Sequence, residues 1–309
     1  VMHRFAVDPD RVIVQGASMG GVGAYRLATL QPDKWSVALP LIGFQSAGLL
    51  PLSVNLRNVP VRQINGAADP LIPVPPADAS AQRLDELGYD YRYWLLTDRG
   101  HEAGGFVYDC VFAGAVDFVR ERHPAIVRFA VDPSLDEIDA ASGLELRFDS
   151  AYWVGVIRAR DETASARVEA FSSALPSSDD TVARVDRIVD NTDQGADLCG
   201  PNPAIRTGDE WRERAVEIQS GDPRPARNEI DATLENVASL TIDLSGAGID
   251  VASAADLTVS SDGPCVVALR GLRPGQLVAS GDAEHRADDD GVAAVGIEAA
   301  GTVVMRLRR

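Results

Sequence analysis

Apolar and polar positions in the first 124 residues follow two periods in turn, that of a buried strand and that of a helix. Short apolar runs predict buried strands, and apolar residues spaced three or four apart predict helices. The expected strands are Val12–Gln15, Val37–Ile42, a run ending at Gly66, and Tyr91–Leu96. The expected helices are Val22–Leu30, Ala77–Leu87 and Val111–Arg120. This alternation predicts an α/β layer structure for residues 1–124.

After residue 124 the helical periods give way to short alternating runs separated by turn residues. These runs are Leu144–Phe148, Tyr152–Arg158, Ala166–Phe171, Glu229–Leu234, Leu240–Leu244, Val266–Leu269 and Val303–Leu307. Alternation between closely spaced turns is typical of all-β domains, so we expect a sandwich-like domain over residues 125–309. A polar insertion rich in Pro and Asp interrupts it near residues 175–228, and Asp209–Gln219 is the helix expected there.

A serine flanked by small residues stands between the first expected strand and the first expected helix. The sequence Gly16-Ala17-Ser18-Met19-Gly20 has the form Gly-x-Ser-x-Gly. At a strand-to-helix turn this form predicts a nucleophile elbow, in which the serine hydroxyl stands clear of the sheet. Glycines on either side leave room where the strand and the helix approach each other. The motif alone is a weak signal, because plain Gly-rich turns contain it too.

Two later loops each add a side chain that completes this chemistry. Asp69 follows the strand that ends at Gly66 and lies in a Pro-bounded loop, although Asp-Pro is also a common turn. His101 lies in the loop after Tyr91–Leu96, and it is the one histidine of the four in the chain with this placement. Open α/β sheets build their sites at the carboxyl ends of the strands, so we expect these residues to converge there.

The chain order Ser18, Asp69, His101 is the Ser…Asp…His order of α/β hydrolases. Residues 7–123 resemble the C-terminal half of a catalytic domain of that superfamily, most strongly its prolyl oligopeptidase-like and polyhydroxybutyrate depolymerase-like esterase branch. The segments that carry the resemblance are Val7–Val12, Gly16–Gly21, Gly66–Asp69 with Pro73, and Gly100-His101. Residues 150–154 and 235–242 are similar, more loosely, to a β-rich tail of some of these esterases.

The resemblance implies a serine hydrolase with a Ser-His-Asp catalytic triad. Ser18 would be the nucleophile, His101 the general base, Asp69 the residue that orients the imidazole, and the backbone N–H of Met19 an oxyanion donor. The expected substrates are small or polymeric carboxylic esters, and we expect neither a metal nor a cofactor. Two alternatives stay open: a serine peptidase of the prolyl oligopeptidase type, and an inactive fragment with a binding β domain.

The chain departs from the superfamily pattern at its start. About four strands and a loop with a second oxyanion donor normally precede the nucleophile strand, whereas ten residues precede Arg11 here. We therefore expect the C-terminal part of a longer protein, in which the first strand leaves an unpaired sheet edge. Such an open edge could pair with a second chain and form an oligomer.

The composition excludes some partners. The formal net charge of −17 argues against nucleic acid binding, because the phosphate backbone would be repelled. No apolar run reaches the about 18 residues of a membrane span, so a soluble protein, secreted or cytoplasmic, is expected. Of the three cysteines, Cys199 and Cys265 could pair in a secreted protein. Trp153 is expected in the core of the β-rich domain, with ligand stacking as the alternative.

Overall fold

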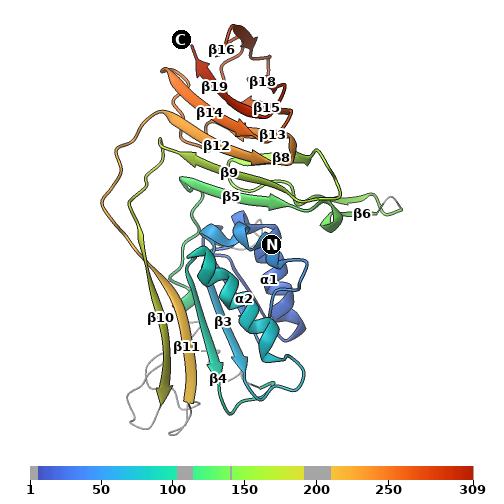
Figure 1. Ribbon diagram of the computed structural model, residues 1–309, viewed down its shortest axis with the longest axis vertical. Coiled ribbons are helices and arrows are strands. Elements are labelled where there is room, and N and C mark those ends of the chain that lie inside the picture. Colours follow the sequence, from blue (N-terminus) through green and yellow to red (C-terminus); the bar gives the residue numbers. More distant parts are fainter. Residues whose placement is uncertain (1–5, 103–113, 140, 191–209, 309) are drawn as a thin grey trace. The chain divides into compact units, whose positions relative to one another are not determined.

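The computed structural model describes residues 6–102, 114–139, 141–190 and 210–308. The chain divides into two compact units, and many of their helices and strands are labelled in Figure 1. The first unit comprises Val1–Glu121 and Asp180–Gly221, and the second comprises Arg122–Asp179 and Asp222–Arg309. Residues 180–221, which are part of the insertion predicted near residues 175–228 of the β-rich region, thus belong to the first unit.

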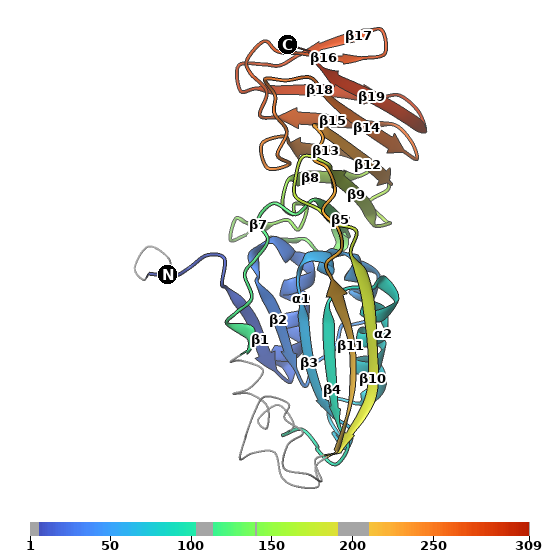
Figure 2. The same ribbon diagram turned by 90° about the vertical axis from the view of Figure 1, so that its left-hand side faces the viewer.

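The first unit is built on a six-stranded sheet in the order β1-β2-β3-β4-β11-β10. Its strands are β1 (Ile13–Ala17), β2 (Val37–Leu41), β3 (Val61–Gly66), β4 (Tyr91–Leu96), β10 (Thr181–Asp190) and β11 (Glu210–Gln219). The first four strands are parallel, whereas β11 and β10 extend the sheet in antiparallel fashion. Figure 2 shows the strands side by side, with β1 at one edge and β10 at the other.

Helices cover one face of this sheet. They are α1 (Met19–Leu30), α2 (Val74–Leu87) and two 3₁₀ helices, η1 (Pro32–Lys34) and η2 (Leu50–Asn58). Tyr25 of α1 and Leu84 of α2 share a buried cluster with Tyr91 and Tyr93 of β4. The opposite face buries Leu39, Ile64 and Trp94 together with Ala115. Of the helix predicted over Val111–Arg120, residues 111–113 lie outside the described residues, 114–115 are helical, and 116–117 form a turn.

The helix predicted over Asp209–Gln219 is wrong, because Glu210–Gln219 forms strand β11. It pairs with β4 on one side and β10 on the other. Trp211, Glu213 and Ala215 alternate inward with period two, but a charged residue at the middle inward position hides this pattern in the sequence. Glu213 is buried between the guanidinium groups of Arg92 (3.1 Å) and Arg187 (2.7 Å), so its charge is paired there.

The second unit is all β, with η3 (Pro133–Leu135) as its one short helical turn in the described residues. A seven-stranded sheet (order β17-β16-β19-β14-β12-β9-β5) and a four-stranded sheet (β18-β15-β13-β8) contribute to one buried core. A β6–β7 hairpin adds a two-stranded sheet. The strands are β5 (Ile126–Val131), β6 (Glu137–Asp139), β7 (Leu144–Leu146), β8 (Val154–Ala159), β9 (Ala166–Ser172), β12 (Glu229–Glu235), β13 (Val237–Asp243), β14 (Ala255–Ser261), β15 (Cys265–Arg270), β16 (Leu277–Ser280), β17 (Ala283–Arg286), β18 (Val292–Ile297) and β19 (Gly301–Leu307).

Each of the seven runs predicted after residue 124 contains or overlaps a strand. Trp153 lies in the core as predicted, 1% exposed, and its indole N–H donates to the carbonyl of Pro124 at 2.8 Å. Cys265 is a buried free thiol, whereas Cys110 and Cys199 lie outside the described residues. None of the described helices is long and apolar enough to cross a membrane.

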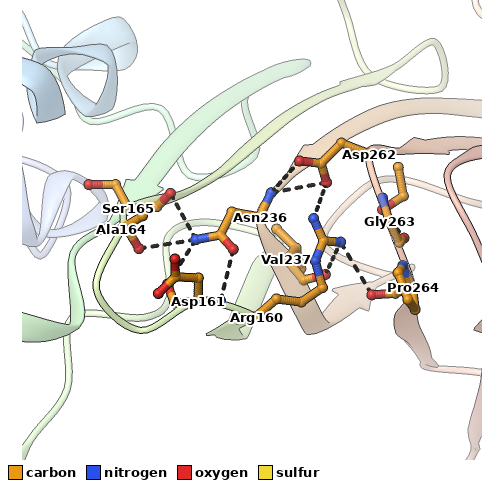
Figure 3. Close-up of polar contacts among 10 residues, drawn as sticks. Arg160, Asp161, Ala164, Ser165, Asn236, Val237, Asp262, Gly263 and Pro264 are labelled. Atoms are coloured by element: carbon orange, nitrogen blue, oxygen red, sulfur yellow. Dashed lines mark hydrogen bonds and ion pairs between the residues drawn. The ribbon is translucent and has the colours of Figure 1, made fainter.

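A polar cluster fixes the turns through which the chain passes from one sheet of the second unit to the other (Figure 3). Asn236 turns the chain between β12 and β13 in a left-handed conformation (φ 55°), and its amide nitrogen donates to the carbonyls of Asp161, Ala164 and Ser165. Arg160 forms an ion pair with Asp262 in the turn between β14 and β15. These bonds join three turns. The geometry of the turns is therefore fixed by side-chain contacts as well as by the backbone hydrogen bonds between strands.

Candidate active site

Ser18 occupies the sharp turn between β1 and α1. Its backbone angles, φ 59° and ψ −121°, lie in a region that residues other than glycine rarely adopt. The Ser18 amide donates to the carbonyl of Leu41 on β2 (3.0 Å), and the Ser18 carbonyl accepts from the amides of Gly21 and Val22. The turn is therefore bonded on both sides, which holds the strained backbone in place.

Close glycine contacts hold the first turn of α1 against the strand ends. A Cβ on Gly16 would lie 2.3 Å from the carbonyl oxygen of Gly20. A Cβ on Gly43, just beyond β2, would lie 2.6 Å from the carbonyl carbon of Gly21. The contact between Gly21 and Gly43 has no counterpart in the sequence motif, because Gly43 is distant in the chain. Ile42, directly before Gly43, is held at φ 48°, a strained angle for a β-branched residue.

We expect Gly43→Ala to destabilise the first unit by about 1–3 kcal/mol, because its added methyl group must displace the backbone of α1. The same displacement moves Ser18, so activity should fall by a larger factor than the folded fraction. Gly23→Ala is the matched control, since Gly23 lies within α1 and a Cβ there meets nothing within 4 Å. Denaturant titration of both variants tests this; equal stability of the two would contradict it.

The loops after β3 and β4 bring Asp69 and His101 together. The Nδ1 atom of His101 lies 2.9 Å from Oδ2 of Asp69, whose side chain is fully buried. The amide of Ala68 donates to the carbonyl of Arg99 (2.9 Å), which joins the two loops. A Cβ on Gly66 would lie 2.2 Å from that same carbonyl oxygen, so only glycine lets the loops approach this closely.

The surroundings of Asp69 favour its ionised form. Burial alone would raise the pKa of Asp69, but hydrogen bonds from the amides of Ile72 (3.0 Å) and Leu71 (2.8 Å) and from His101 lower it below its usual value. An ionised Asp69 can only accept, so Nδ1 of His101 carries the shared proton. This leaves Nε2 of His101 as the nitrogen that can act as a base.

This shift predicts how stability depends on pH. The pKa of Asp69 is lower in the folded chain than in the unfolded chain. The ionised Asp69 therefore stabilises the fold in full above the pKa of the unfolded chain, about 3.9. This stabilisation is lost as the pH falls through the folded value. We therefore expect the stability difference between the wild-type chain and Asp69→Asn to shrink as the pH is lowered from 5 to 2. A difference that grows in acid, measured by denaturant titration, would contradict this.

A triad has two hydrogen bonds, and the second, between Ser18 and His101, is not formed in the described structure. Among the described residues, no hydrogen bond joins the Ser18 hydroxyl to His101, and the Ser18 side chain makes no capping bond to α1. Catalytic hydrogen bonds often tighten only when substrate is bound. Met19, which begins α1, is 85% exposed, and the N–H at the first position of a helix has no acceptor within the helix.

Glu102, directly after His101, forms a hydrogen bond inside the loop that carries the histidine. Its Oε1 accepts a hydrogen bond from the amide of Gly100 (3.1 Å). The bond to its own amide and then the bond from Gly100 lower the pKa of Glu102. In the described part of the chain, no group of three or more metal-ligating side chains is found.

Comparison with known proteins finds similarity in structure only. No family model and no curated protein matches the chain. Over 38% of its length it is similar to a solved thermostable esterase, at 20% identity and a TM-score of 0.34. Over 37% it is similar to esterase PE8, at 22% identity and a TM-score of 0.30. The chain covers 34% and 51% of those proteins, and we infer no function from TM-scores this low.

Proposed function

We propose that this chain is a serine hydrolase of the α/β type that acts on carboxylic esters. The observation that carries the proposal is the 2.9 Å contact between His101 and the buried Asp69, in a unit that also holds Ser18 in a strained strand-to-helix turn. A strained backbone and a buried carboxylate paired with a histidine both cost free energy, and strained backbone clusters at functional sites. Their occurrence in one unit supports catalysis more than packing.

The proposed mechanism assigns each group one role. Nε2 of His101 takes the proton of the Ser18 hydroxyl as Oγ attacks the acyl carbonyl, because a neutral serine is a weak nucleophile. Asp69 holds the tautomer and stabilises the imidazolium that forms. The Met19 amide donates to the developing oxyanion. His101 then returns the proton to the leaving alkoxide. Water attacks the acyl-enzyme with His101 again as the base, which releases the acid and restores Ser18.

Turnover of p-nitrophenyl acetate and butyrate by the purified chain tests the proposal, with a peptide p-nitroanilide as the competing substrate. Saturable ester hydrolysis is the expected result. Faster turnover of the anilide would instead support the serine peptidase alternative.

A non-catalytic chain is the second candidate, and a specific observation favours it. β1, which leads into Ser18, lies at the edge of its sheet, and Met19 beside it is 85% exposed. Oxyanion stabilisation is strongest where water is excluded, so an open elbow weakens it. Two results together would support this alternative. The chain would turn over neither the esters nor the anilide, and its β-rich unit (residues 122–179 and 222–309) would bind a ligand specifically.

A further inference from the structure

Gln63 is a fully buried polar side chain at the centre of the first unit, on strand β3. Its Oε1 accepts a hydrogen bond from the hydroxyl of Tyr25, whose pKa is raised by burial so that it stays a donor. Its Nε2 lies 2.9 Å from Oδ1 of Asn65, 3.2 Å from the carbonyl of Ala77 and 3.3 Å from that of Gly43. Two amide hydrogens therefore serve three acceptors, and both ends of the side chain are bonded.

The partners of Gln63 belong to the segments that carry the proposed triad. Tyr25 lies on α1, the helix that begins directly after Ser18. Gly43 packs against Gly21 in the first turn of that helix. Ala77 lies in the first turns of α2, the helix that follows the Asp69 loop.

The fourth partner of Gln63 is Asn65, which lies beside the loop that carries His101. Asn65 is followed by Gly66, whose missing Cβ leaves the space that Arg99 and Gly100 of the His101 loop occupy. Asn65 is itself fully buried, and its Nδ2 has no hydrogen-bond partner in the described structure. Among the described residues, the hydrogen bond from Gln63 to its Oδ1 is the one that orients the Asn65 side chain.

We propose that Gln63 is a positioning residue that sets the distance between Ser18 and the Asp69–His101 pair. The inference rests on the proposed function. Apolar packing fills the space between these segments, but it tolerates small shifts, whereas a buried hydrogen bond fixes distance and direction. Misplacement of reacting groups by about 1 Å can cost about 10²-fold in rate, so such a buried amide can matter without touching substrate.

The test compares two buried glutamines of the first unit, each replaced by methionine. Gln45 is the control: it is 1% exposed, its Oε1 accepts from Ser53 (2.8 Å), and its Nε2 donates to Thr29 (3.1 Å). Thr29 lies in the last turn of α1 and Ser53 on η2, so neither partner lies in the first turn of α1 or in the loops of Asp69 and His101. Both substitutions keep the volume and remove a bonded amide, so both should lower stability. Kinetics are measured well below the melting temperature of each variant.

We expect Gln63→Met to lower kcat by about tenfold or more with KM changed by less than about twofold, and Gln45→Met to change kcat by less than about twofold. Equal losses of kcat in the two variants would overturn the proposal. Should Gln63→Met fail to fold, Tyr25→Phe removes one hydroxyl from the same network. It should then lower kcat by about threefold or more, and unchanged kcat would overturn the proposal.

A second readout separates this inference from the proposed function. The proton between Nδ1 of His101 and Asp69 gives a downfield ¹H resonance, assigned by its loss in His101→Ala. We expect Gln63→Met to shift or broaden this resonance and Gln45→Met to leave it in place. The resonance reports geometry whether or not the chain turns over an ester. An inactive wild-type chain would count against the proposed function, whereas an unshifted resonance in Gln63→Met would count against the positioning role.

Discussion

Ser18→Ala is expected to lower kcat for ester hydrolysis by about 10⁴–10⁶-fold while leaving the unfolding midpoint within error of the wild-type chain. The proposed mechanism forms its covalent bond to the Ser18 Oγ, so no other group can replace it. The hydroxyl makes no capping bond to α1, so the fold loses no such bond when it is removed. Alanine keeps the same Cβ and the same strained turn, so the neighbouring backbone is unchanged.

Hydrolysis of p-nitrophenyl butyrate by Ser18→Ala is measured beside that by Ser46→Ala. Ser46 is exposed and lies outside the candidate site, so this control makes the same chemical change without touching the elbow. Wild-type turnover by Ser46→Ala with none by Ser18→Ala is the expected pair of results. Retained turnover in Ser18→Ala would mean that another group or a contaminant performs the reaction.

Asp69→Asn is expected to lower kcat by about 10³–10⁴-fold with a small change in KM. Asparagine keeps an oxygen for the amides of Leu71 and Ile72, so the loop geometry persists. Its amide group can donate to Nδ1 of His101, which would place the imidazole proton on Nε2, the nitrogen that must accept from Ser18. The variant thus tests the tautomer that Asp69 is proposed to hold.

Asp98→Asn is the control for this effect, because Asp98 is exposed in the same loop as His101. It removes one negative charge near the site without changing the partner of the imidazole. Loss of activity confined to Asp69→Asn is expected from an orienting role. Similar losses in both variants would indicate that the site needs negative charge rather than an oriented histidine.

Local patterns were enough to predict the elements that carry the site. The strand predicted over Tyr91–Leu96 has the same bounds as β4, and that over Val37–Ile42 exceeds β2 by one residue. The helix predicted from Ala77 begins three residues earlier, at Val74, because two prolines are tolerated in its first turn. Asp69 and His101 were predicted to converge because each follows a parallel strand of one sheet.

What the sequence could not provide are contacts between segments that share no period. Strand β11 contains many helix-forming residues, and its pairing with β4 and β10 overrides that preference. Gly43 and Gln63 matter because of what lies across from them, at Gly21 and at Tyr25. No local signal marks either residue, since a glycine after a strand and a glutamine within one have many ordinary explanations.

The most direct test of the central claim is labelling of the purified chain with a fluorophosphonate probe, followed by mass spectrometry of its peptides. The probe reacts with a serine only where a base activates it and an oxyanion site receives the phosphoryl oxygen. We predict one labelled residue, Ser18, with labelling lost in His101→Ala. Absence of labelling at Ser18 in the folded wild-type chain, or equal labelling in His101→Ala, would contradict the account.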